Sequence, residues 1–177
     1  AGKGYFIWEG GDGVAKYIAR GRIRSFWQPI TSGEISMTKD GVLYQMILPE
    51  GGNALRRLVV VFSAIHSNYN EASLWRYFPH HYQHLRGLTP GDTAILRIGD
   101  LGGVVGSFYG DTLDAPGNAT AVSSLIARVI RSLEIPPAQV CLLGSSKGAT
   151  GAVRHGVALG LPFVAADPVL GDEYYER

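Results

Sequence analysis

The sequence predicts an α/β fold with a mostly parallel sheet, and three observations support that prediction. From residue 57 onward, apolar runs alternate with amphipathic stretches, as strands alternate with helices in such sheets. The run "RRLVVVFSAI" is apolar without alternation, which is typical of a strand covered on both faces. Earlier, an Asp-Gly pair separates two shorter apolar runs and predicts an antiparallel hairpin.

The elements before residue 57 divide into an ambiguous part and a clear one. Residues 1–33 hold short apolar segments between glycines, and we interpret them as an N-terminal extension of a single domain, 1–177, with its core in 34–177. The hairpin follows, with strands "EISMT" and "VLYQMIL" around "KDG". Asp40-Gly41 tolerates the positive φ that a tight turn requires.

From residue 57 the expected elements follow in order. A strand in 56–65 precedes a helix over 70–78, which Asn70 caps and Pro79 ends. A strand over 92–100 leads into a glycine-rich loop, 101–118. A helix then opens at Asn118, followed by a strand in 139–144, a helix in 149–160 and a strand in 162–170. The helix after Asn118 carries an apolar stripe at helical spacing: Val122, Leu125, Ile126, Val129, Ile130 and Leu133.

Composition narrows the function classes. The 177 residues are 46% hydrophobic and 18% charged, which excludes a disordered chain. The net charge of +1 gives no reason to expect nucleic acid or an anionic membrane as a partner. No apolar stretch of about 18 residues is present, so we expect no membrane span. The start lacks a secretory signal, which favours a cytoplasmic location, and it lacks an initiator Met, which indicates trimming or excision from a longer chain. The lone Cys141 rules out an internal disulfide.

The stretch "LLGSSKGATG" carries the chemistry. Gly144, Ser146 and Gly148 fit G-x-S-x-G, in which a strand turns sharply into a helix and exposes the central serine. An apolar strand precedes this motif and a small-residue helix follows it, as the motif requires. The N–H of Lys147 would lie at the helix start and face a developing oxyanion. Phosphate-loop and dinucleotide motifs are absent, and we expect no cofactor.

These segments resemble the XcbB/CpsF family of capsular polysaccharide biosynthesis proteins, a branch of the α/β-hydrolase superfamily. The resemblance covers roughly residues 55 to 170 and lies in the "VVVFS" strand, the "RIGD" and "GSFY" segments, the "GSSKGATGA" corner and "DPV". It implies an α/β-hydrolase sheet and a role in surface-glycan assembly. A related branch includes serine acyltransferases of accessory secretion.

The triad is incomplete in the sequence. Asp167 follows the strand after the serine and is either the acid or a cap before Pro168. In α/β-hydrolases a histidine comes after the acid, but the ten residues beyond Asp167 contain none. His155 is nine residues past Ser146, about 180° around the helix and about 13 Å along it, so we reject it as the base.

We therefore expect the core to lack its last strand–helix units. Either the chain is a fragment, or a second chain completes the sheet and supplies the histidine. His66 follows the strand whose end, Ser63, Ala64 or Ile65, normally gives the second oxyanion N–H. We expect His66 to be either a pocket-lining residue or an exposed loop residue. A role as the general base is the weaker alternative.

Other residues leave alternatives open. Phe108 and Tyr109 form either an acceptor platform or an aromatic plug, and Ser107 and Tyr109 are candidate pocket residues. Asp100 binds substrate or caps the glycine turn. The Lys147 side chain favours an anionic substrate or is simply exposed. Two further patterns are His80 with His84, spaced like zinc ligands but expected to be a solvated helix end with no metal, and the sequon Asn118-Ala-Thr120, expected to be a helix cap.

The resulting hypothesis is a serine esterase or acyltransferase. Ser146 would attack an ester or thioester and pass the acyl group to water, or to the hydroxyl of a small molecule or glycan. The alternative is a non-catalytic subunit or half-domain of a glycan-assembly or secretion complex.

Overall fold

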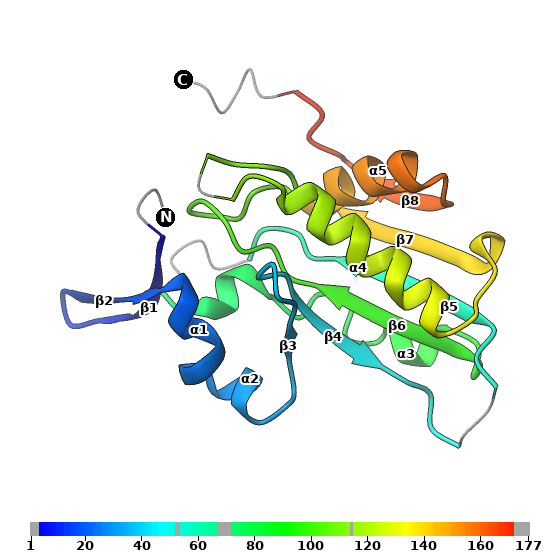
Figure 1. The fold of residues 1–177 in the computed structure, drawn as a ribbon, viewed down its shortest axis with the longest axis horizontal. Helices are drawn as coiled ribbons and strands as arrows, with labels where there is room; N and C mark the ends of the chain where they lie inside the picture. The colour runs from blue at the N-terminus through cyan, green and yellow to red at the C-terminus, as the bar shows by residue number, and fades with distance from the viewer. Residues whose placement is uncertain (1–3, 52–53, 67–71, 114, 172–177) are drawn as a thin grey trace.

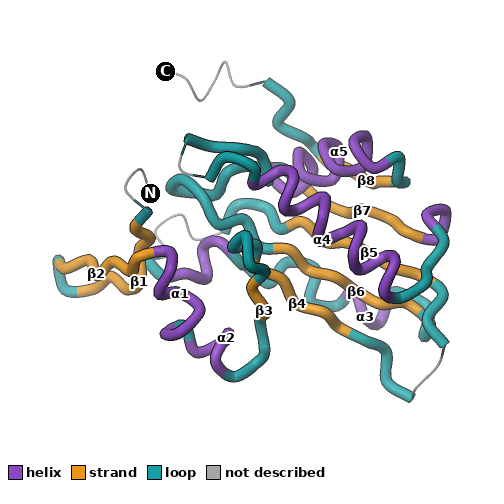
Figure 2. Tube along the Cα trace, viewed as in Figure 1, coloured by secondary structure: helices purple, strands orange, loops and turns teal. Residues whose placement is uncertain are grey.

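The computed structural model describes residues 4–51, 54–66, 72–113 and 115–171. Within them a sheet of six strands runs in the order β3-β4-β6-β5-β7-β8, and a separate hairpin pairs β1 with β2 (Figures 1 and 2). The strands are β1 (Tyr5–Gly11), β2 (Val14–Ala19), β3 (Ser36–Met37), β4 (Leu43–Ile47), β5 (Arg57–Phe62), β6 (Thr93–Ile98), β7 (Val140–Ser145) and β8 (Phe163–Ala166). The helices are α1 (Arg20–Phe26), α2 (Gln28–Thr31), α3 (Leu85–Leu88), α4 (Asn118–Ser132) and α5 (Lys147–Leu159), with the 3₁₀ turns η1 (Leu74–Tyr77) and η2 (Pro137–Gln139).

The predicted fold class is confirmed. Strands β5, β6, β7 and β8 pair in parallel, while β3 and β4 form the antiparallel hairpin expected around Asp40-Gly41. Gly41 has a φ of +87°, the left-handed backbone that the turn needs. Strand β4 then adds to β6 in the antiparallel direction. The carboxyl ends of the parallel strands lie together on the left in Figure 1.

Helices α4 and α5 cover one face of the sheet. Even-numbered residues of β5 and β6, such as Val60 and Leu96, point toward that face, because side chains alternate along a strand. The apolar stripe of α4 packs on them through Val122, Leu125 and Ile126. This is the periodicity that the sequence predicted, and Figure 1 shows α4 crossing in front of the strands.

The N-terminal residues that looked ambiguous in sequence form the β1–β2 hairpin, α1 and α2. Phe6, Ile23 and Trp27 from this region pack with Leu43 and Phe78 in a second buried cluster. The hairpin projects at the left of the molecule in Figure 1. The region therefore closes over one end of the sheet through a core of its own.

The connection between β5 and β6 departs most from the sequence prediction. The expected helix over 70–78 is only the short 3₁₀ turn η1, and Ser73 caps it by accepting from the backbone N–H of Trp75 at 3.2 Å. The predicted cap, Asn70, lies outside the described residues. Residues 79–84 are not helical, so His80 and His84 do not share a helix face, and the expectation of a helix end there was wrong.

None of the helices in the described part of the chain is both long and apolar enough to cross a lipid bilayer.

Candidate active site

Ser146 occupies the corner between β7 and α5. Its backbone has φ 50° and ψ −124°, a conformation that costs energy for any residue with a Cβ atom. Its N–H donates to the carbonyl oxygen of Ala166 at 2.9 Å, and its own carbonyl accepts from the N–H groups of Ala149 and Thr150. The side chain is half-buried, and its Oγ makes no hydrogen bond to any described residue. The corner therefore holds the backbone rigidly and leaves the hydroxyl uncommitted.

The two glycines of the motif permit this corner through close backbone contact. A Cβ atom on Gly144 would lie 2.1 Å from the carbonyl oxygen of Gly148. A Cβ atom on Gly148 would lie 2.2 Å from the carbonyl oxygen of Phe62 in β5. Both distances are far below van der Waals contact with atoms that cannot rotate away, so the start of α5 rests directly on the end of β5.

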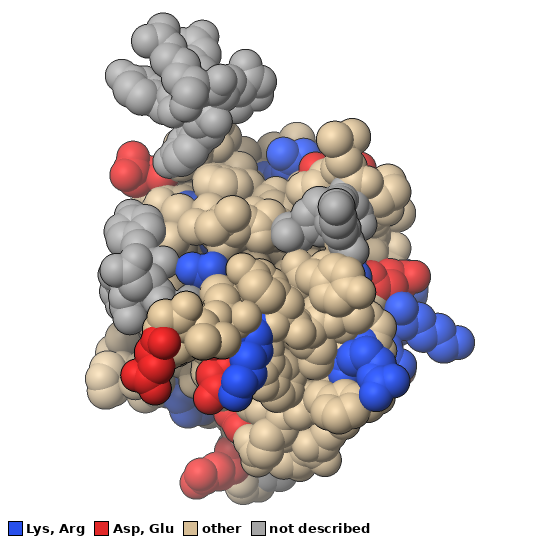
Figure 3. Space-filling model, turned by 90° about the vertical axis from the view of Figure 1, so that its left-hand side faces the viewer, with Lys and Arg blue, Asp and Glu red and all other residues tan. Residues whose placement is uncertain are grey.

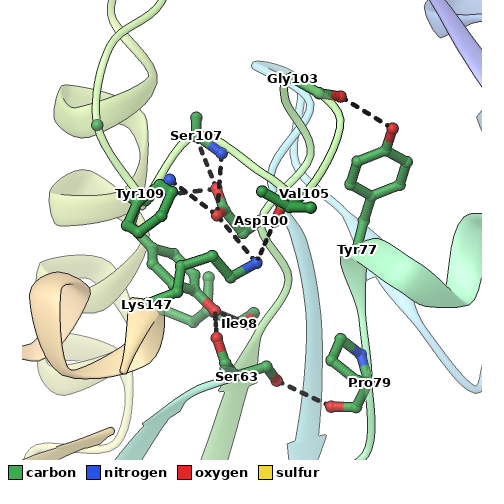
Figure 4. A network of polar contacts seen from close by, with 12 residues as sticks. Ser63, Tyr77, Pro79, Ile98, Asp100, Gly103, Val105, Ser107, Tyr109 and Lys147 are labelled. Carbon is green, nitrogen blue, oxygen red and sulfur yellow. Dashed lines mark hydrogen bonds and ion pairs between the residues drawn. The ribbon is translucent and has the colours of Figure 1, made fainter. Parts of the chain in front are cut away.

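Lys147, the next residue, turns its side chain into the protein. The residue has no exposed surface, which excludes both an exposed lysine and a side chain that contacts substrate. Its Nζ donates to the carbonyl oxygen of Val105 at 2.9 Å and lies 3.2 Å from Oδ2 of Asp100 (Figure 4). Its backbone N–H is at the first position of α5 and has no acceptor among the described residues.

Asp100 organises the loop after β6, as the glycine-turn alternative predicted. Its two carboxylate oxygens accept from the backbone N–H groups of Ser107, Phe108 and Tyr109 at 3.0 to 3.2 Å. They also accept from Oγ of Ser107 at 2.6 Å. The carboxylate is fully buried, so these donors and the Lys147 ammonium replace its water shell.

Tyr109 is a buried plug, which answers one of the alternatives for the GSFY segment. It has no exposed surface and cannot serve as a platform for an acceptor. Its hydroxyl donates to the carbonyl oxygen of Ser63 at 2.9 Å, and its ring meets that of Phe62 edge-on at 4.8 Å. Ser107 is likewise engaged, because its Oγ donates to Asp100 and accepts from the amide of Asn118 at 3.1 Å.

The 63–66 segment lies beside this network. The hydroxyl of Ser63 donates to the carbonyl oxygen of Pro79 at 2.9 Å, so that side chain faces the protein. Ala64 and Ile65 are half-buried, and the N–H of Ala64 has no acceptor among the described residues. His66 is half-buried too. The pKa of nearby His81 is lowered mainly by the burial of His81 and, to a smaller extent, by the charge of His66.

His155 is excluded from the chemistry, as the helical spacing predicted. Its ring is buried and stacks on Phe62 with 5.6 Å between ring centres. Its Nδ1 is 2.9 Å from Oγ of Ser123, and its Nε2 is 3.1 Å from the carbonyl oxygen of Tyr109. Burial lowers the pKa of His155 to about 4, so the ring is neutral at pH 7.

Asp167 follows β8 at the same edge of the sheet. It is exposed, has a φ of +55° and makes no hydrogen bond or ion pair with the described residues. Because the preceding residue, Ala166, accepts the N–H of Ser146, Asp167 is fixed close to the corner along the sheet edge. The structure thus places Asp167 beside Ser146 without assigning it a partner.

The surface around this edge carries no dominant charge. Figure 3 shows lysine, arginine and acidic groups scattered on a largely uncharged face. A groove of about 970 Å³ lies between α1, the turn at residues 39–41 and the start of α4, and none of Ser146, Lys147 and Asp167 lines it. Among the described residues, no cluster of His, Cys, Asp and Glu could hold a metal ion.

The known proteins that this chain resembles were found by similarity of structure. No family model and no curated protein matches the chain, so the resemblance to the XcbB/CpsF family stays an expectation. A chain of the Glycosylation Associate Protein (Gap123) complex from Streptococcus agalactiae matches with a TM-score of 0.53 and 19% identity, over 77% of this chain and 24% of that chain. The capsule O-acetyltransferase of Neisseria meningitidis serogroup A matches with a TM-score of 0.57 and 15% identity, over 80% and 53% of the two chains.

An acetyl xylan esterase from Aspergillus awamori matches with a TM-score of 0.55 and 16% identity, over 77% of this chain and 50% of that chain. This chain therefore spans between about a quarter and about a half of the length of these proteins. At such identities the likeness shows the fold. The mostly parallel α/β sheet predicted from the sequence resembles the fold of a capsule O-acetyltransferase and of an acetyl xylan esterase.

Proposed function

We propose that the protein is a serine enzyme that moves acyl groups through an acyl-enzyme, from an ester or thioester to water or to a sugar hydroxyl. The observation that supports this most is the backbone of Ser146, with φ 50° and ψ −124° at a strand-to-helix corner. Backbone strain of this kind persists only where the surrounding structure imposes it, and it is concentrated at functional sites. Here it presents an uncommitted hydroxyl beside the first N–H of a helix.

In the first half of the reaction, Oγ of Ser146 bonds to the carbonyl carbon of the donor while its proton passes to a general base. The carbonyl oxygen becomes an oxyanion. Its collapse breaks the bond to the leaving alkoxide or thiolate, which takes the proton from the base. In the second half, water or a sugar hydroxyl gives its proton to the base and attacks the acyl group. Oγ of Ser146 then leaves and recovers that proton.

Two backbone N–H groups would stabilise the oxyanion. One belongs to Lys147 at the start of α5, where the helix dipole also favours negative charge. The other would come from the end of β5, where the N–H groups of Ala64 and Ile65 have no acceptor among the described residues. Ala64 is the first candidate because it lies nearer to the strand, and the Tyr109 hydroxyl binds the carbonyl of the same peptide group. Gly148 brings these two segments into backbone contact, which supports a shared site.

The general base in this proposal is a histidine oriented by Asp167. His155 cannot serve, because both of its ring nitrogens are engaged inside the protein. We propose that the histidine comes from a segment that pairs with the outer edge of β8, provided by a longer form of this chain or by a second chain. Support comes from β8 itself, an apolar strand whose Phe163 and Val164 are 41% and 55% exposed at the sheet edge.

We propose a glycan as the acyl acceptor and a thioester as the donor. The solved structures that resemble this fold include a capsule O-acetyltransferase, one structure of which holds CoA, and an acetyl xylan esterase. The XcbB/CpsF resemblance points to surface-glycan assembly as well.

A fluorophosphonate probe tests the serine chemistry, because it phosphonylates an activated serine. The test uses the chain together with the segment that supplies the histidine. In this form we expect the wild-type protein to be labelled at Ser146 and Ser146→Ala to be unlabelled. Ser145→Ala is the matched control, since Ser145 is also half-buried but lies within β7. Labelling that persists in Ser146→Ala, or a folded wild-type protein that resists the probe with the histidine-bearing segment present, contradicts the proposal.

A second candidate function is a non-catalytic subunit of a glycan-assembly or secretion complex. The exposed apolar edge of β8 favours it, because such an edge is a ready site for pairing with another chain. A folded protein that binds a partner, with binding lost in Val164→Lys, and still resists the probe when that partner is bound would support this function instead.

A further inference from the structure

The two segments proposed to hold the oxyanion lie on different strands, and one loop contacts both. Lys147 follows β7, and the 63–65 segment follows β5. Residues 100–109 leave β6 and touch each of them through separate polar contacts (Figure 4). The conserved geometry of an oxyanion hole requires its two N–H groups to keep a fixed spacing.

The first contact holds residue 147 through its side chain. The Lys147 ammonium is anchored between Oδ2 of Asp100 at 3.2 Å and the carbonyl oxygen of Val105 at 2.9 Å. It also lies 5.6 Å from the centre of the Tyr109 ring. The Lys147, Asp100 and Tyr109 side chains are inaccessible to solvent, where such contacts are strong and an unpaired charge is costly. The side-chain contacts of Lys147 therefore also restrict its backbone, including the N–H group proposed to bind the oxyanion.

The second contact holds the end of β5. The hydroxyl of Tyr109 donates to the carbonyl oxygen of Ser63, which belongs to the same peptide group as the N–H of Ala64. Fixing that carbonyl fixes the orientation of the peptide plane, and hence of the Ala64 N–H. Burial raises the pKa of Tyr109 well above its ordinary value, so the phenol remains a hydrogen donor.

The loop between the two contacts is itself made rigid by Asp100. Three consecutive N–H groups, from Ser107 to Tyr109, converge on its carboxylate. Phe108 and Tyr109 have φ values of 54° and 58°, a left-handed backbone that these residues adopt only under constraint. Asp100 supplies that constraint, so a displacement at one contact is transmitted to the other.

We propose that residues 100–109 brace the oxyanion hole, with Tyr109 and Lys147 as positioning residues that set the spacing of the Lys147 and Ala64 N–H groups. The brace touches no substrate. It rests on the proposed function, and it gives the GSFY segment a role in the rate of acylation rather than in substrate binding, because small displacements of such donors lower transition-state stabilisation.

Tyr109→Phe is the primary test, because it removes one oxygen atom and leaves the buried ring in place. With p-nitrophenyl acetate as the probe ester, we expect kcat to fall about tenfold or more with KM nearly unchanged. The rate of fluorophosphonate labelling at Ser146 should fall by a similar factor, since the phosphonyl oxygen occupies the same hole. Leu125→Ala, in the core under α4, controls for stability: it lowers the urea midpoint at least as much without slowing either reaction.

A second set of variants tests the shared brace. Lys147→Met combined with Asp100→Asn removes both buried charges and avoids leaving one unpaired. We expect this pair to slow acylation, and adding Tyr109→Phe to slow it by less than the product of the separate factors, because both act on one structure. If the combined variant slows acylation by the full product of the separate factors, or if Tyr109→Phe is labelled at the wild-type rate, the proposed brace is wrong but the proposed function stands. No labelling of the wild-type protein with the histidine-bearing segment present overturns the proposed function and the brace with it.

Discussion

The N–H of Ser146 donates to the carbonyl oxygen of Ala166 at 2.9 Å, which links the corner after β7 to the last residue of β8. The two strands are in parallel register just before this point, with Ser145 opposite Ala166. Any movement of the end of β8 therefore moves the serine corner as well. The residue that follows Ala166 is Asp167, so this one hydrogen bond fixes the proposed acid relative to the proposed nucleophile.

Asp167→Asn is predicted to separate activity from stability. If Asp167 orients the base, loss of its charge should lower kcat by roughly 10³-fold or more. Its side chain is exposed and has no partner among the described residues, so the free energy of unfolding should change by less than about 0.5 kcal/mol. Ester hydrolysis and urea unfolding measure the two quantities.

Asp12→Asn is the matched control for that variant. Asp12 is also an exposed aspartate with positive φ, 50°, but it lies in the turn between β1 and β2. We expect it to leave both activity and stability unchanged. Equal activity of the Asp167 and Asp12 variants would remove Asp167 from the triad.

Gly148→Ala should damage the fold and the corner together. The new Cβ atom would lie 2.2 Å from the carbonyl oxygen of Phe62, so α5 must move away from β5. We expect a loss of about 2 kcal/mol or more in stability and loss of probe labelling. Gly21→Ala, in α1 with no atom within 4 Å of its new Cβ, should instead stabilise by about 0.5 kcal/mol. A Gly148 variant with wild-type stability in urea would refute the close packing.

Much of the sheet could be predicted because its signals are local. The continuous apolar runs of β5 and β7 and the helical stripe of α4 each report burial within a few residues. The glycine spacing around Ser146 reports the corner for the same reason, since each glycine meets backbone from an adjoining segment. Residues 4–33 gave no such signal, because neither the hairpin nor the helices there have a regular apolar period.

What could not be predicted depends on partners far along the chain. A lysine in the first turn of a helix is normally exposed, and only the buried Asp100 carboxylate makes Lys147 an interior residue. The sequence likewise did not show that Asp100 accepts hydrogen bonds from the loop N–H groups of Ser107 and Tyr109. Its position just after β6 predicted only that it would cap the glycine turn. His80 was misjudged because Trp75 and Phe78 hold its ring outside any helix, at 5.1 and 5.7 Å.

The sequon at Asn118 is predicted to remain unmodified in the folded protein. Asn118 begins α4, but its side chain does not cap the helix; its amide donates to Oγ of Ser107 and to the carbonyl oxygen of Gly110. Incubation of the purified, folded protein with an oligosaccharyltransferase and its lipid-linked donor should therefore add no mass at Asn118. Glu34→Asn creates an exposed sequon as the positive control, and glycosylation of Asn118 alongside it would show that this site opens.

Burial of His155 is predicted to make stability depend on pH. Burial, more than any nearby charge, lowers its pKa from 6.5 to about 4, so between these values the unfolded chain binds more protons than the folded one. Stability from this group is therefore fully present above pH 6.5 and is lost as the pH falls toward 4. Since the carbonyl of Tyr109 can only accept, we assign the ring hydrogen to Nε2, and protonation has to occur at Nδ1 beside Ser123.

Urea unfolding at pH 7 and pH 5 measures this contribution. We expect His155 alone to cost about 2 kcal/mol of stability between the two values. The half-buried imidazoles of His80 and His81, whose pKa values burial also lowers, add to the slope in the same direction, so the wild-type slope does not isolate His155. His155→Gln does, because it removes the titrating group and can still donate to the Tyr109 carbonyl. Its stability should fall less than that of the wild type between pH 7 and pH 5, and parallel losses in the two proteins would mean that His155 is protonated as readily in the folded state as in the unfolded chain.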